Sequence, residues 1–177
     1  MRGKTTSSET IYEDPWTHVR LDDVHFADGH RGSYAVVTKP AGVNVVALSS
    51  SGTLILAKEY RHALGDYSIE AVSGAIEPGE TPTAAAHREL AEELGFAATR
   101  LTPLTVVQPF TAGVNSTSHL FLAEGLAPTP SRPDPGEYIE PVEMSLSDAV
   151  EGVVNGKIVH ASSCLAILLA ERHIAGR

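Results

Sequence analysis

The sequence has little of several features that mark particular classes of protein. It contains one cysteine, Cys164, so an internal disulfide is excluded. It has no run of eighteen apolar residues and no charged-then-apolar leader, so we expect a cytoplasmic protein that does not associate with membranes. The eight histidines show no H-x-x-x-H spacing, and we therefore assign no zinc site.

Basic residues are also scarce. The chain has 13 Lys and Arg against 22 Asp and Glu, which gives a formal net charge of −9. Nucleic-acid-binding proteins normally neutralise backbone phosphates with clustered Lys and Arg, so we expect no nucleic-acid partner. An acidic protein that handles phosphate groups needs a metal ion.

The pattern of apolar residues predicts one main domain of mixed secondary structure. A chain of 177 residues that is 42% hydrophobic can bury one core but not two full ones. Alternating, β-branched runs predict strands at 16–26, 33–40, 43–49, 52–61, 67–74, 100–110 and 119–126. A Pro-rich loop at 127–138 and two helices, at 145–156 and 161–173, complete the chain. This order indicates an α+β fold with helices packed on a sheet.

A further helix is predicted in the middle of the chain. Thr81 can cap its start, Pro82 suits its first turn because the missing N–H costs nothing there, and Gly95 can close its end. Leu90 and Leu94 then form its core-facing side.

Three carboxylates crowd onto this helix. Glu89 and Glu93 lie one turn apart, and Glu92 flanks them. An acidic surface exposed to solvent is the ordinary explanation of such a pattern. However, like charges four residues apart repel, and negative charge is unfavourable near a helix C-terminus. Arg88 can compensate in part, but a divalent cation with oxygen ligands, Mg²⁺ or alternatively Mn²⁺, compensates better.

The segment 74–96 resembles the Nudix box, G-x5-E-x7-R-E-U-x-E-E-x-G-U, where U is a bulky apolar residue. The resemblance implies the family's α/β/α sandwich and the hydrolysis of a nucleoside diphosphate linked to another group, giving two monophosphates. It also implies metal binding by Glu89 and Glu93, a binding or orienting role for Glu92, and a backbone carbonyl ligand from Ser73. Glu80 and Arg88 would brace the loop and the helix. The matching residues are Gly74, Glu80, Arg88, Glu89, Leu90, Glu92, Glu93, Gly95 and Phe96.

Short motifs outside the box are similar to the ADP-ribose and ADP-sugar pyrophosphatase branch of this family. They are "KEYR", "IEAVSG", "GEYIE" and "GKIVHASSCLAILL", in that order. This resemblance implies that Arg61 contacts substrate and Glu70 orients the site. It also implies that residues 1–39 form a small antiparallel β-domain, which exchanges between subunits of a homodimer, ahead of a hydrolase domain at 40–177. Without the resemblance, Arg61 would read as a surface charge.

The substrate implied is ADP-ribose or another nucleoside diphosphate sugar. GDP- or UDP-sugars are the alternatives, as is a Nudix module that senses a nucleotide sugar without turning it over. Hydrolysis of nucleoside triphosphates or dinucleoside polyphosphates is disfavoured by the flanking motifs. The chain departs from the branch at Val72 and Ser73, where Pro and Ala are usual, and at "FTAGVNS", which replaces an S-P-G signature.

Two aromatic residues are candidates for contact with the base. Trp16 and Tyr34 fall in the N-terminal strands, where related enzymes carry aromatic residues that sandwich the base. Packing in a core or an interface is the competing interpretation.

The general base is predicted from an absence. Many relatives carry a glutamate after the S-P-G signature, but residues 97–123 contain no Asp or Glu. Similar enzymes that lack it use the first glutamate of the G-E-x-[VI]-E loop, which is Glu137; the second is Glu140. A charge exposed to solvent in the loop is the alternative for Glu137, and a box glutamate is the alternative base.

Overall fold

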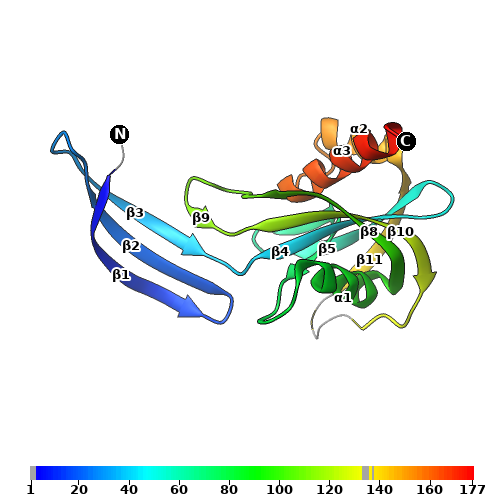
Figure 1. The fold of residues 1–177 in the computed structure, drawn as a ribbon, viewed down its shortest axis with the longest axis horizontal. Coiled ribbons are helices and arrows are strands. Elements are labelled where there is room, and N and C mark those ends of the chain that lie inside the picture. The colour runs from blue at the N-terminus through cyan, green and yellow to red at the C-terminus, as the bar shows by residue number, and fades with distance from the viewer. Residues whose placement is uncertain (1–2, 133–135, 137) are drawn as a thin grey trace. The chain divides into compact units, whose positions relative to one another are not determined.

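The computed structural model describes residues 3–132, 136 and 138–177. These residues divide into two compact units, the first made of the chain up to residue 41 together with 108–117, and the second of 42–107 and 118–177 (Figure 1). The sequence predicted an N-terminal region at 1–39, and this prediction did not include the segment 108–117. No helix in these described ranges is long and apolar enough to cross a membrane.

The first unit is a four-stranded sheet with the order β1-β2-β3-β9. Neighbouring strands are antiparallel except for β3 and β9, which are parallel. The strands are β1 (Lys4–Asp14), β2 (Thr17–His25), β3 (Arg31–Thr38) and β9 (Val114–Asn115).

Strand β1 was not predicted, and its composition explains why. Its residues "KTTSSETIYED" do not alternate between apolar and polar, and ten of the eleven are exposed. Polar contacts accompany its pairing with β2, since Ser7 donates to Asp23 at 2.8 Å and Ser8 donates to Asp22 at 2.6 Å. A strand with both faces in solvent carries no burial signal in its sequence.

The second unit is built on a seven-stranded mixed sheet. Its main path is β11-β5-β4-β10-β8, while β6 pairs with β5 and β7 pairs with β4. Among the described strands of this sheet, β4 and β10 are the one parallel pair. The strands are β4 (Gly42–Leu48), β5 (Thr53–Arg61), β6 (Asp66–Glu70), β7 (Val72–Ala75), β8 (Phe96–Val107), β10 (Ser118–Pro128) and β11 (Ile139–Ser145).

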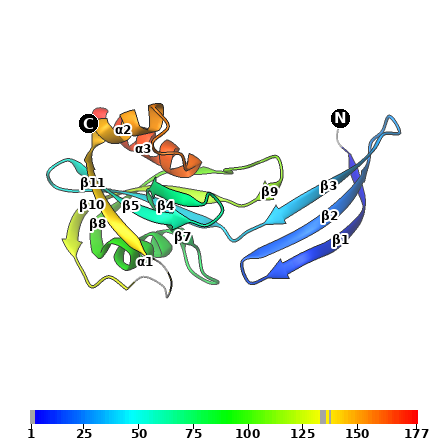
Figure 2. The same ribbon diagram turned by 180° about the vertical axis from the view of Figure 1, so that it is seen from behind.

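Helices cover both faces of this sheet (Figures 1 and 2). On one face α1 (Pro82–Leu94) buries Ala86, Leu90 and Leu94 against Val45 and Phe121. On the other face α2 (Leu146–Val154) and α3 (Ala161–Ala175) pack on a second cluster of residues. Residues of β4 alternate between the two clusters, as the period of a strand buried on both sides requires. The predicted α/β/α sandwich is confirmed.

Two features of the sheet differ from expectation. The run 67–74, predicted as one strand, is divided into β6 and β7, which pair with different neighbours, and the change of partner falls at Ala71. Strand β11 was not predicted because its sequence "IEPVEMS" contains Pro141. Since β11 lies at the edge of the sheet, it is a position where proline is tolerated.

Candidate active site

Helix α1 begins and ends as its sequence predicts. The Thr81 hydroxyl accepts a hydrogen bond from the backbone N–H of Ala84 at 3.2 Å, and Pro82 lies in the first turn. Gly95 has φ = 69°, a left-handed conformation that glycine adopts without strain, and its N–H donates to the carbonyl of Ala91. These ends fix where the glutamates of the helix stand.

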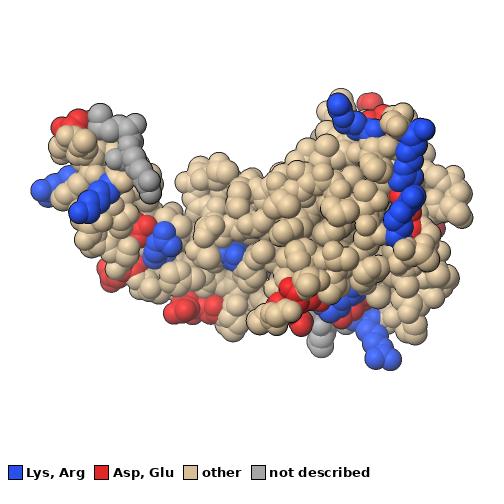
Figure 3. Space-filling model, in the orientation of Figure 1, with Lys and Arg blue, Asp and Glu red and all other residues tan. Residues whose placement is uncertain are grey.

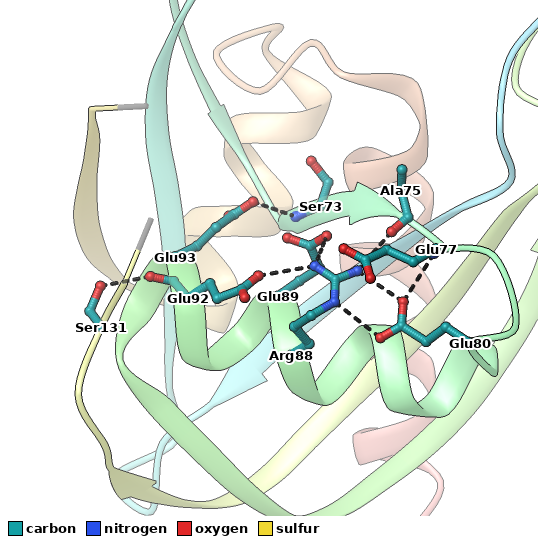
Figure 4. Close-up of polar contacts among 9 residues, drawn as sticks. All are labelled: Ser73, Ala75, Glu77, Glu80, Arg88, Glu89, Glu92, Glu93 and Ser131. Carbon is teal, nitrogen blue, oxygen red and sulfur yellow. Dashed lines mark hydrogen bonds and ion pairs between the residues drawn. The ribbon is translucent and has the colours of Figure 1, made fainter. Parts of the chain in front are cut away.

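Arg88 joins three of the box glutamates (Figure 4). Its Nε and Nη2 donate to the two carboxylate oxygens of Glu80, each at 3.0 Å. Its Nη1 donates to Glu89 at 2.8 Å and to Glu92 at 3.0 Å, and Nη2 also donates to the carbonyl of Ala75 at 2.8 Å. One guanidinium thus connects the loop before α1, the strand β7 and the helix.

This network sets the charge of the groups in it. Hydrogen bonds from Arg88 lower the pKa of Glu80 below its usual value, so Glu80 is ionised at neutral pH. Hydrogen bonds to Glu80, Glu89 and Glu92 outweigh burial and raise the pKa of Arg88. Acidic and basic side chains lie against each other over α1 in the space-filling view (Figure 3). The crowding of carboxylates is therefore partly neutralised within the chain.

Glu93 points to a different place. It is 8% exposed, and its Oε1 accepts a hydrogen bond from the backbone N–H of Ser73 at 3.3 Å. The contact joins α1 to β7, at the residue whose carbonyl is the predicted backbone ligand (Figure 4).

Gly74 has a steric reason to be glycine. A Cβ at this position would overlap the carboxylate of Glu89. The backbone of β7 therefore forms a cradle against which this carboxylate lies, and any larger residue would displace it. The spacing of the box does not reveal this requirement.

The described residues contain no group of three His, Cys, Asp or Glu side chains close enough to hold a metal as they stand. Glu89 and Glu92 turn toward Arg88 while Glu93 turns toward Ser73 (Figure 4). The donor set still has the chemistry of a hard-cation site, with carboxylate oxygens beside a strand carbonyl. The cradle at Gly74 keeps one carboxylate against the backbone that would share such an ion.

Arg61 and Glu70 form a second centre in the same unit. Arg61 donates from Nε and Nη2 to the carboxylate of Glu70 at 3.1 and 2.7 Å, and its Nη1 lies 2.8 Å from Glu59. A longer contact of 3.4 Å links Nη2 to the hydroxyl of Ser73. Burial tends to raise the pKa of Glu70, but the hydrogen bonds from Arg61 and the other nearby groups lower it on balance. These contacts place the guanidinium of Arg61 beside β7.

Two residues at the start of α3, the N-cap His160 and Ser163 in the first turn, complete this centre, and the sequence did not single them out individually. Nδ1 of His160 lies 3.2 Å from Glu70 and 2.8 Å from the hydroxyl of Ser163. The Ser163 hydroxyl also accepts the backbone N–H of Ala71 at 2.9 Å. The start of α3 thus holds the junction between β6 and β7. The stretch "HASS" within the motif "GKIVHASSCLAILL" was the available signal, since positions 160 and 163 are one helical turn apart.

A pocket of about 580 Å³ opens beside this centre. It lies within the second unit and joins β5, β6 and β7 to the start of α3. Its lining residues are Arg61, Leu64, Ser68, Glu70, Ser73, Val159, His160 and Ala161.

The remaining predicted site residues lie elsewhere. Trp16 and Tyr34 belong to the first unit and are 63% and 48% exposed, so the packing of their own unit does not bury them. Trp16 lies in the turn between β1 and β2 rather than in a strand, and its backbone N–H donates to Asp14 at 2.8 Å. Glu137 falls outside the described residues. Glu140 lies on β11, exposed, 3.0 Å from the Nζ of Lys58.

Fold and site together define an α/β/α sandwich enzyme with an arginine-braced cluster of glutamates at a strand end. Residues 38–161 match the NUDIX domain family, and residues 4–37 match the family described as the nucleoside diphosphate sugar hydrolase N-terminal domain. The chain belongs to the Nudix hydrolase family.

Individual relatives cover nearly the whole chain. An ADP-ribose pyrophosphatase of Bacillus subtilis is 31% identical, with 93% of this chain and 90% of that protein covered. A methanol dehydrogenase activator of Bacillus methanolicus is 25% identical over the same shares. The crystal structure of an ADP compounds hydrolase superimposes with a TM-score of 0.89 at 26% identity, covering 99% of this chain and 96% of that one.

Proposed function

We propose that this enzyme hydrolyses the diphosphate bond of ADP-ribose, or of a related nucleoside diphosphate sugar, to two monophosphates. The observation that carries the proposal is the arrangement of Arg88 and its glutamates beside Ser73, in a chain with its own N-terminal sheet. Residues 4–37 of that sheet match the family described as the nucleoside diphosphate sugar hydrolase N-terminal domain. The B. subtilis relative named above is an ADP-ribose pyrophosphatase.

Mg²⁺ is the proposed cofactor, with Mn²⁺ as the alternative. Glu89, Glu92, Glu93 and the carbonyl of Ser73 would hold it. A divalent cation there supplies Lewis acidity and neutralises charge on the diphosphate oxygens. The oxygen-only donor set and the cradle at Gly74 support the assignment.

The chain's own residues then have distinct roles. Glu80 holds Arg88 by two hydrogen bonds, and Arg88 in turn orients Glu89 and Glu92. Glu70 holds Arg61 in the same way, so that the guanidinium is positioned beside Ser73 to meet a phosphate or ribose oxygen.

We assign Glu137 as the general base, with a box glutamate as the alternative. Ile139, two residues further along, pairs with Glu59, and Glu59 contacts Arg61. The strand β11, which follows Glu137 in the sequence, is thus paired with β5, the strand that carries Arg61. Gly136 precedes Glu137 in the sequence, and a glycine beside a base suits its approach to the attacking water.

The first unit is proposed to make a homodimer and to contribute to base binding. Its outer strand β1 leaves an edge available for pairing, and Trp16 and Tyr34 expose rings that can stack on a base. We propose that residues 1–39 form the dimerisation region and residues 40–177 the hydrolase domain. We also propose a cytoplasmic location.

The test is hydrolysis of ADP-ribose by the full chain with Mg²⁺, with AMP and ribose 5-phosphate separated by chromatography. ADP-glucose, GDP-mannose and UDP-glucose serve as parallel substrates. We expect fastest turnover of an ADP-sugar. A preference for GDP- or UDP-sugars would correct the base assignment. Binding of ADP-ribose without turnover of any of them, with either metal, would instead indicate a sensing module.

A further inference from the structure

Glu70 is a buried carboxylate whose two oxygens have different surroundings. The residue is 4% exposed. Its Oε1 accepts a hydrogen bond from Nε of Arg61 at 3.1 Å, and its Oε2 accepts one from Nη2 of Arg61 at 2.7 Å. Oε2 also lies 3.2 Å from Nδ1 of His160. Because a buried charge needs polar partners in place of the water it has lost, His160 helps to hold this carboxylate.

His160 stands at a helix position where a side chain usually has another use. It is the N-cap of α3, a place where Ser, Thr, Asp or Asn commonly accepts a backbone N–H of the first turn. The His160 side chain makes no such bond to the described backbone of α3. Its ring faces Glu70 and the Ser163 hydroxyl instead. A departure from local preference next to a candidate site indicates a role in that site.

The neighbours of the ring determine which nitrogen carries its proton. Burial and, to a smaller extent, Arg61 lower the pKa of His160 more than Glu70 raises it, so the ring is neutral at neutral pH. A lone pair on Nδ1 would face the Glu70 carboxylate. A proton on Nδ1 lies instead between that carboxylate and the Ser163 hydroxyl, and both can accept it. The proton therefore belongs on Nδ1.

Ser163 ties the ring to the same stretch of backbone as the carboxylate. Its Oγ lies 2.8 Å from Nδ1 of His160 and accepts the backbone N–H of Ala71 at 2.9 Å. Ala71 directly follows Glu70 in the chain, and Ser163 is fully buried. The ring and the carboxylate are thus arranged relative to each other before any substrate binds.

We propose that His160 is a positioning residue for the hydrolytic reaction, because its Nδ1–H fixes the carboxylate of Glu70 and Glu70 in turn fixes the guanidinium of Arg61. The inference rests on the proposed function, in which Arg61 meets a phosphate or ribose oxygen. The guanidinium has a second carboxylate nearby, since its Nη1 lies 2.8 Å from Glu59. Without His160 the Glu70 carboxylate can turn, and Arg61 can shift toward Glu59.

Two amide substitutions separate the two ring nitrogens. His160→Asn places an amide N–H close to the position of Nδ1, and Asn is also a favoured N-cap. The longer side chain of His160→Gln places its amide close to the position of Nε2. The kinetics are measured with the nucleotide sugar that the wild-type protein hydrolyses fastest. We expect KM to rise about five- to tenfold in His160→Gln, the value of one hydrogen bond, with kcat within about threefold, and both to stay within about twofold in His160→Asn.

Two further measurements show whether the effect passes through Arg61. In a double-mutant cycle, His160→Gln should cause no further loss of kcat/KM once Arg61→Ala is present. The Nε–H of Arg61 donates to Glu70, so its exchange with solvent, followed by NMR and assigned from the Arg61→Ala spectrum, should be faster in His160→Gln. His173→Gln, at an exposed position of the same helix, is the control and should change neither KM nor this exchange.

Three results would overturn the inference while leaving the proposed function intact. They are an unchanged KM in His160→Gln, an effect of His160→Gln that persists in the Arg61→Ala background, and equal changes in His160→Asn and His160→Gln. Equal changes that accompany equal falls in melting temperature would make the role of His160 structural. Wild-type protein that hydrolyses no nucleotide sugar would overturn the proposed function itself, and the inference with it.

Discussion

Arg88 and Glu80 are joined by two parallel hydrogen bonds, each of 3.0 Å, across the start of α1. A bidentate pair fixes the orientation of a guanidinium as well as its distance from the carboxylate. The remaining nitrogen, Nη1, is then aimed at Glu89 and Glu92. The loop residue Glu80 thereby determines where two helix carboxylates stand, although it lies eight positions before Arg88.

Arg88→Lys should therefore impair catalysis although it preserves the charge. An ammonium group cannot reproduce a planar fork that reaches Glu80, Glu89 and Glu92 together. We expect kcat/KM for ADP-ribose to fall about 10- to 100-fold, the usual cost of removing a group that orients metal ligands, and the melting temperature to fall. Arg172→Lys, at an exposed position of α3, is the control. Equal kinetics of the two variants would show that the bracing is dispensable.

Glu93→Gln separates catalysis from folding. The amide oxygen of Gln can still accept the N–H of Ser73, so the link between α1 and β7 survives. The negative charge proposed to hold Mg²⁺ is lost, and the repulsion from Glu89 is relieved. We expect kcat to fall more than about 100-fold, beyond the usual effect of outer-shell changes, with an unchanged or higher melting temperature without metal. Glu151→Gln, at an exposed position of α2, should change neither kcat nor the melting temperature. Near wild-type turnover by Glu93→Gln would mean that the metal site is misplaced.

Gly74→Ala tests the cradle. The added methyl overlaps the Glu89 carboxylate, which must move away from β7. Because displacement of a reacting group by about 1 Å can cost about 100-fold, we expect a loss of that order in kcat/KM. Gly32→Ala is matched, since it is also on a strand but its Cβ would make ordinary contacts of 3.5 Å or more. If both variants turn over ADP-ribose equally, the position of Glu89 is not critical.

Glu124 makes the stability of the folded protein depend on pH in the acidic range. Hydrogen bonds from Arg177, which outweigh burial, and from Arg100 lower its pKa from 4.5 to about 2. Because the folded-state pKa lies below the unfolded one, the stabilisation is fully present above pH 4.5 and is lost as pH falls toward 2. Melting temperatures of wild type and Glu124→Gln should therefore differ at neutral pH and converge as pH is lowered through that range. Parallel curves would contradict the shift. Glu171→Gln, exposed on α3, should track wild type.

The box and the local signals at its ends were enough to predict α1. Thr81, Pro82 and Gly95 act on backbone groups within a few residues of themselves. The start and the end of α1 can therefore be predicted from the sequence. The core-facing side of the helix, formed by Leu90 and Leu94, was also predictable from the helical spacing of its apolar residues.

Features that depend on distant residues were not predictable. The contact between His160 and Glu70 joins positions 90 apart, and the overlap of a Gly74 side chain with Glu89 exists only once β7 lies against α1. Strand β1 was missed because pairing alone, without burial, orders it. The roles of Glu137, Trp16 and Tyr34 stay predictions, and so does the metal.

The last prediction concerns the general base. Glu140, the other glutamate of its motif, is exposed on β11, and its carboxylate already lies 3.0 Å from the Nζ of Lys58. We expect Glu137→Gln to lower kcat by about 100-fold or more, as removal of a general base does, with little change in KM because substrate contacts remain. Glu140→Gln should lose far less.

A pH profile distinguishes the alternatives for the base. If Glu137 accepts the proton, the acidic limb of the kcat profile should disappear in Glu137→Gln and persist in Glu140→Gln. Full kcat of Glu137→Gln between about pH 6 and 9 would assign the base to a box glutamate instead. Because Glu89 and Glu92 already share Arg88, that base would have to be Glu93, which accepts the N–H of Ser73. Loss of kcat in Glu93→Gln with metal affinity intact would then identify it.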